Sequence, residues 1–163
     1  MKKISLILLI SVIFVLQALA GGGKKEEENN TCKRDESAAA VKKEMVPFRY
    51  EKTSTTYVTF KNYNQVNTIA APLFFDNKYK FVINTEGLPK DIKVQVYDKP
   101  RGMRDGAKLI HESTEKQFSF EIGEDYLNNR VYIDYVIPAI EESGEDDIVQ
   151  KGCIVMGSGY ENL

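Results

Sequence analysis

The chain has 163 residues, of which 42% are hydrophobic, and this is enough for one domain with its own core. Its 22 basic and 24 acidic residues give a net charge of −2, and loss of Lys2 and Lys3 with a signal peptide would make it −4. Such mild acidity does not indicate nucleic acid as a partner. With one histidine and two cysteines, the chain also lacks the usual ligands of a zinc site.

The first twenty residues have the three parts of a bacterial secretory signal peptide. Lys2 and Lys3 precede an apolar run at 4–16, and the small residues Ala18 and Ala20 provide a cleavage signature. We expect cleavage after Ala20 and a periplasmic or secreted protein. No later apolar stretch approaches the ~20 residues of a membrane span, so no integral membrane anchor is expected.

Residues 21–34 are polar and lack apolar periodicity, which predicts a flexible linker. Residues 35–45 predict a short helix, because Ala38, Val41 and Met45 recur at helical spacing and Pro47 ends the run. A helix of about three turns must pack on the rest of the domain to be stable.

From Phe48 onward, alternating apolar residues predict strands, and β-branched and aromatic residues fill them. The apolar runs that predict strands lie at 58–60, 73–75, 79–83, 92–96, 108–112, 118–122, 133–135 and 154–156. Turn residues separate them at intervals of about 8–14 residues. The pattern favours an all-β fold over 35–163: an antiparallel β-sandwich, jelly-roll or Ig-like, of about seven or eight strands with a short N-terminal helix.

Cys32 and Cys153 are the two cysteines, and an even pair in an exported chain predicts a disulfide. The alternative is two unpaired thiols, one exposed and one buried. His111 lies in a predicted strand, where a lone histidine is usually a surface or half-buried polar residue. A Ser-His-Asp triad could use only His111, and Ser158 lies between glycines too closely spaced for a nucleophile elbow. Gly157 and Gly159 instead predict a turn or bulge ending the last strand.

Two clusters of charge are candidate binding sites. The acidic stretch from Glu141 to Asp147 offers carboxylates for calcium, with Glu142, Glu145, Asp146 and Asp147 as ligands, although their spacing matches no EF-hand loop and a solvated loop is the simpler interpretation. The basic group Lys93, Lys99, Arg101 and Arg104 lies on a strand and the following turn, which could present guanidinium groups to carboxylates or phosphates. Alternatively, these charges only keep the domain soluble.

Two segments carry a resemblance. Residues 84–89 (NTEGLP) with 96–99 (VYDK), and 151–156 (KGCIVM), resemble a group of small uncharacterised secreted β-sandwich proteins of Bacteroidetes over about residues 32–160. The resemblance includes both cysteines and implies no activity. The V-x-V-Y-D pattern is also similar to sorting domains of type IX secretion, but the closing strand pattern of those domains is missing here.

The sequence therefore predicts a non-catalytic exported module, without a cofactor, that binds an envelope protein or an anionic surface polymer. The alternatives are a structural subunit of a secretion or envelope assembly, and a small secreted hydrolase using His111.

Overall fold

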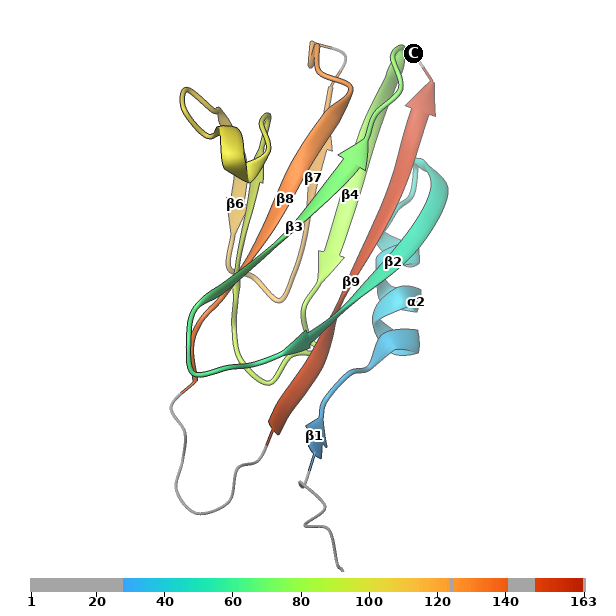
Figure 1. Ribbon diagram of the computed structural model, residues 1–163. Helices are drawn as coiled ribbons and strands as arrows, with labels where there is room; N and C mark the ends of the chain where they lie inside the picture. Colours follow the sequence, from blue (N-terminus) through green and yellow to red (C-terminus); the bar gives the residue numbers. More distant parts are fainter. Residues whose placement is uncertain (1–27, 124, 141–148, 163) are drawn as a thin grey trace, which may run out of the picture.

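The computed structural model describes residues 28–123, 125–140 and 149–162 (Figure 1). The elements are β1 (Glu28–Asn30), α2 (Arg34–Glu44), β2 (Arg49–Thr59), β3 (Gln65–Pro72), β4 (Asn77–Asn84), β5 (Lys93–Tyr97), the 3₁₀ turn η1 (Arg101–Met103), β6 (Leu109–Ser113), β7 (Gln117–Ile122), β8 (Arg130–Ile137) and β9 (Val149–Asn162). Helix α2 agrees with the predicted helix to within one residue at each end. The predicted signal peptide and its cleavage site lie outside the described residues.

The strands form two sheets that pack face to face. In the five-stranded sheet, β9 pairs with both β2 and β4, β1 pairs with the start of β9, and β7 pairs with β4. The four-stranded sheet has the order β3-β8-β5-β6. Among the described strands all pairs are antiparallel except β1 with β9. This confirms the predicted all-β sandwich with a short helix.

The main core lies between the two sheets, where alternate residues of each strand meet. Phe81 and Ile83 of β4 face Ile133 and Tyr135 of β8 within one continuous apolar cluster. This alternation explains why the predicted strands at 79–83, 118–122 and 133–135 agree with β4, β7 and β8, since one face of each is apolar.

Helix α2 covers the outer face of the five-stranded sheet, beside β9 and β4 (Figure 1). Val41 and Met45 of the helix pack with Val82 and Val155 in a second, smaller core. The helix comes so close to β9 that a Cβ atom on Gly157 would overlap Val41 Cγ1. The predicted turn at this glycine is therefore wrong: β9 continues to Asn162, and the missing side chain leaves room for the helix.

A Gly157→Ala variant should lose about 1–3 kcal/mol of unfolding free energy, because a packed interface must shift to admit the methyl group. Gly123→Ala is the matched control, since no described atom beyond its chain neighbours lies within 4 Å of its Cβ position. Urea unfolding measures both. Val41→Ala added to Gly157→Ala should recover part of the loss. Equal midpoints for the two single variants would contradict this packing.

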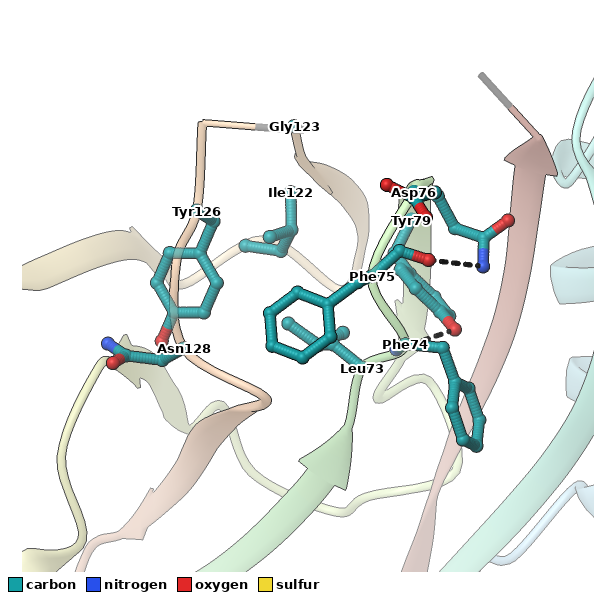
Figure 2. A pocket seen from close by; sticks show the side chains of 10 residues that line it. Leu73, Phe74, Phe75, Asp76, Tyr79, Ile122, Gly123, Tyr126 and Asn128 are labelled. Carbon is teal, nitrogen blue, oxygen red and sulfur yellow. Dashed lines mark hydrogen bonds between the residues drawn. The ribbon is translucent and has the colours of Figure 1, made fainter.

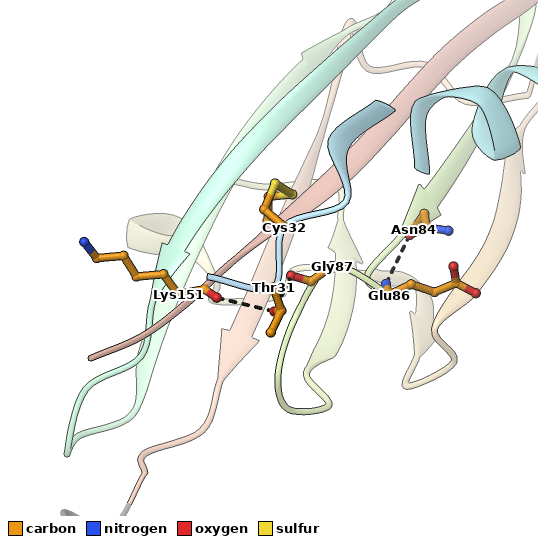
Figure 3. Close-up of a disulfide and its surroundings, with 7 residues drawn as sticks. Thr31, Cys32, Asn84, Glu86, Gly87 and Lys151 are labelled. Carbon is orange, nitrogen blue, oxygen red and sulfur yellow. Dashed lines mark hydrogen bonds between the residues drawn. A yellow bond between two sulfur atoms is a disulfide. The ribbon is translucent and has the colours of Figure 1, made fainter. Parts of the chain in front are cut away.

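A disulfide joins the segment before α2 to β9 (Figure 3). Cys32 and Cys153 form the predicted pair. Thr31 Oγ1 donates a hydrogen bond to the Gly87 carbonyl, and the Cys153 N–H donates to the same oxygen. The predicted polar linker thus ends earlier than expected. Residues 28–30 form β1, because strand pairing uses backbone groups and needs no apolar side chains.

Replacing both cysteines with serine should lower the unfolding free energy by up to about 4–5 kcal/mol, because the bond closes a loop of 121 residues in the unfolded chain. Urea unfolding of wild type and of Cys32→Ser/Cys153→Ser provides the measurement. Dithiothreitol should destabilise the wild type alone. A difference below about 1 kcal/mol would mean that the crosslink does little to restrict the unfolded ensemble.

Candidate functional site

The outer face of the four-stranded sheet carries a buried acid. In β8, Val131, Ile133 and Tyr135 belong to the core, so Asp134 points to the opposite face. Strand pairing places Thr68 of β3 directly beside it. The connection between β5 and β6, residues 98–108, folds back over this face, which leaves Asp134 only 5% exposed.

Arg104, on that connection, holds Asp134 in place. Its Nη2 atom lies 2.6 Å from Asp134 Oδ2, and Thr68 Oγ1 donates to Asp134 Oδ1 over 2.7 Å. The guanidinium also stacks on the Tyr97 ring, with Cζ 3.7 Å from the ring centroid. These contacts provide the pairing that a buried carboxylate requires, and they fix the direction of the arginine.

An open depression of about 480 Å³ lies beside this ion pair. Both apolar and polar side chains line it: Val66, Gln95, Tyr97, Arg101, Arg104, Ala107, Asp134 and Val136. Arg104 Nη1 is buried and has no hydrogen-bond acceptor within the described residues. Arg101 is exposed and donates from Nη1 to the Val66 carbonyl over 3.3 Å, so a second guanidinium borders the same depression.

The structure brings part of the predicted basic group together. Arg101 and Arg104 share the depression, and Lys99 lies on the same loop, where Nζ donates to the Asp105 carbonyl. Lys93 is not among the lining residues and forms an ion pair with Glu112 over 3.6 Å. Two of the four charges are thus balanced by carboxylates.

Sequence patterns did not identify Asp134, the central acid of this site. Asp134 alternates with Ile133 and Tyr135, which is what a solvated strand position looks like. Nothing in the sequence joins it to Arg104, thirty positions earlier, because that contact depends on how the loop folds back.

His111 lies in β6 as predicted and faces the space between the sheets. Its ring stacks on Phe118 and Phe120, with centroids 5.5 and 5.2 Å away. Nε2 is buried without a hydrogen-bond partner among the described residues. Burial lowers the pKa of His111 below its ordinary value, and the nearby Glu115 carboxylate only partly opposes this shift.

An NMR titration should therefore give His111 a pKa below 6.5, and the signal is unambiguous because the native chain has one histidine. A lowered folded-state pKa means that the unfolded chain binds protons more readily. The stabilisation from the neutral ring is fully present above about pH 6.5 and declines as the pH falls toward the folded-state pKa. A measured pKa at or above 6.5 would contradict the burial of this ring.

A second feature lies at one end of the sandwich, on the β3–β4 turn and the β7–β8 loop (Figure 2). Phe74, Phe75 and Leu127, which we call the apolar tip, are 65%, 71% and 85% exposed. The apolar run at 73–75 had predicted a strand, but it forms the turn after β3. Asp76 and Asn77, which follow it, are common turn residues and were the signal available in the sequence.

The remaining predicted site residues are not assembled into a centre. Ser158 is buried on β9 and donates to Glu51 Oε2 over 2.8 Å. Cys153 is in the disulfide. The calcium candidates Glu142, Glu145, Asp146 and Asp147 lie outside the described residues, and the part of the chain that is described holds no group of three metal-binding side chains. Among the described helices, none is long and apolar enough to cross a membrane.

No family model matches the chain, and no curated protein matches it. The resemblance to secreted Bacteroidetes proteins stays a prediction, and any account of function depends on the geometry described above.

Proposed function

We propose that this protein is an exported, non-catalytic binding module whose depression on the four-stranded sheet takes up carboxylate groups of an envelope or extracellular partner. Export is a prediction from the first twenty residues. It is supported by the Cys32–Cys153 bond, since disulfides persist in oxidising compartments outside the cytoplasm.

The observation that carries the proposal is the buried Nη1 group of Arg104. A buried donor without an acceptor costs about 1–3 kcal/mol. Arg104 lines the depression, so a carboxylate that enters there could supply the acceptor if the side chains around Nη1 shift slightly. Asp134 and Tyr97 already fix the guanidinium, so binding would cost little side-chain entropy.

Arg101 would supply the second contact and most of the net positive charge. It is exposed, and its partner is a neutral carbonyl rather than a carboxylate. Hydrogen bonds between a guanidinium and a carboxylate are charge-assisted and stronger than those between neutral groups. Two arginines bordering one depression therefore favour an acidic ligand over a neutral one.

The walls of the depression define the rest of the ligand. Val66, Ala107 and Val136 are apolar, so the carboxylate should be attached to a compact carbon skeleton. A uronic acid of a surface polymer and an acidic side chain of a protein share this chemistry. The depression is open to solvent, which suits binding, whereas a reaction site usually closes to exclude water.

A structural subunit is the second candidate, and the apolar tip favours it. Side chains as exposed as Phe74, Phe75 and Leu127 often mark a contact with another molecule. The hydrolase alternative has less support: the two ring contacts of His111 are with phenylalanines, and a general base needs a group to activate within hydrogen-bond reach.

Titration with polygalacturonate, a carboxylated polymer, tests the proposal, with neutral dextran as the reference. Arg101→Gln should weaken binding about tenfold, because a charge-assisted hydrogen bond is worth roughly 1.5–3 kcal/mol. Lys90→Gln is the matched control, an exposed cation outside the lining residues. Binding should also weaken as salt rises.

Circular dichroism of each variant checks that the fold is intact. Equal affinity of Arg101→Gln and Lys90→Gln, or equal binding of dextran and polygalacturonate, would refute the proposed site. Poly-glutamate as a third probe shows whether a protein-like carboxylate binds as well as a uronic acid.

A further inference from the structure

The apolar tip is an exposed apolar surface of the kind that often contacts another molecule. Phe74 and Phe75, on the first of two loops, line one small pocket (Figure 2). The exposed Leu127 lies on the second loop, between the lining residues Tyr126 and Asn128. Leaving so much apolar area in water is unfavourable by about 25 cal/mol per Å².

The tip could be buried at little polar cost. The Phe74 N–H donates to Tyr79 Oη over 3.1 Å, and the Leu73 N–H donates to the Asn129 carbonyl over 2.8 Å. Asn77 Nδ2 donates to the Phe75 carbonyl. These backbone groups already have hydrogen-bond partners within the protein, so docking would not leave them buried and unsatisfied.

One carboxylate sits at the end of the tip. Asp76 is exposed, has a φ of 63°, and has no hydrogen-bond or ion-pair partner within the described chain. Aspartate is among the few residues that tolerate this backbone conformation. A partner that offers an apolar surface together with a positive charge would therefore be complementary to the tip.

The outer face of the four-stranded sheet offers both. Its depression has apolar walls at Val66, Ala107 and Val136, and it is bordered by Arg101 and Arg104. With a volume of about 480 Å³ and an open rim, it is concave where the tip is convex. Apolar area and charge thus match between two different surfaces of the same molecule.

We propose that the apolar tip of one copy docks in the depression of a second copy, with Asp76 paired to Arg101 and Phe75 against the apolar walls. The proposal rests on the proposed function, because it treats the depression as a carboxylate site and names its occupant. An anionic bilayer would repel Asp76 and fits the tip less well.

The contact is heterologous, because tip and depression are different surfaces. Each copy keeps one free tip and one free depression, so association continues head to tail into short chains or rings. A symmetric contact between two tips would instead bring two Asp76 carboxylates together, which is unfavourable. Two short loops bury less area than a standard interface. We therefore expect a weak affinity, with a dissociation constant on the order of 100 µM.

Sedimentation velocity from about 10 µM to about 1 mM, a range that brackets such an affinity, should show mass increasing with concentration. Phe75→Ser/Asp76→Asn removes the apolar group and the charge of the tip, and asparagine keeps the backbone conformation. Arg101→Glu reverses the charge of the depression. Each variant alone should remain monomeric, whereas Glu86→Arg, an exposed control in the β4–β5 loop, should behave like the wild type.

Mixing the two defective variants is the decisive step. The Arg101→Glu copy contributes an intact tip and the Phe75→Ser/Asp76→Asn copy an intact depression. The mixture should form a 1:1 dimer and nothing larger. A wild type that stays monomeric throughout, association that survives Arg101→Glu, or a mixture without dimers would each overturn the inference.

Polygalacturonate separates this inference from the proposed function. The Phe75→Ser/Asp76→Asn variant should bind the polymer as the wild type does, since its depression is unchanged. Polymer binding with no self-association would overturn the second-copy docking alone. Loss of polymer binding from this tip variant would overturn the assignment of the two surfaces as separate.

Discussion

The fold depends on one strand that is buried on both faces. From Gly152 to Gly159, β9 contacts the sandwich core on one side, and from Val155 onward it carries α2 on the other. It also pairs along both edges, with β2 and β4. Val155 packs against the helix through its side chain, whereas Gly157 lies under Val41, where a Cβ atom would overlap Val41 Cγ1. Cys153 joins this strand to the N-terminal segment through the disulfide with Cys32.

The parts of the fold that follow from alternation could be predicted from the sequence. Strands β4, β7 and β8 each have an apolar face that alternates along the strand, and α2 has apolar residues at helical spacing and a proline after it. Strand β2 was largely missed, because its residues are mostly threonine, lysine and tyrosine at a sheet edge with little apolar alternation. The apolar run at 73–75 wrongly predicted a strand, because Phe74 and Phe75 are apolar and yet exposed at a turn. Local patterns cannot distinguish an apolar residue that is buried from one that protrudes.

The candidate site shows the same division. A basic turn between β5 and β6 could be recognised from composition and turn residues. The ion pair between Arg104 and Asp134 could not be recognised from the sequence. Arg104 lies on the loop and Asp134 on β8, and they meet only because the loop folds back over the sheet. This ion pair also sets the orientation of the Arg104 guanidinium in the site. It fixes one guanidinium against Tyr97, and among the described residues Nη1 has no acceptor, while Arg101 keeps an exposed charge.

The central claim is that carboxylates bind in this depression and not elsewhere on the surface. The most direct measurement is a ¹H–¹⁵N NMR titration of isotopically labelled protein with galacturonate, a single uronic acid too small to crosslink copies. The account predicts that the amide signals of Val66, Ala107 and Val136 and the side-chain signals of Arg101 and Arg104 shift together and saturate. Shifts centred on the β3–β4 turn, or no saturable shift at the depression, would contradict it.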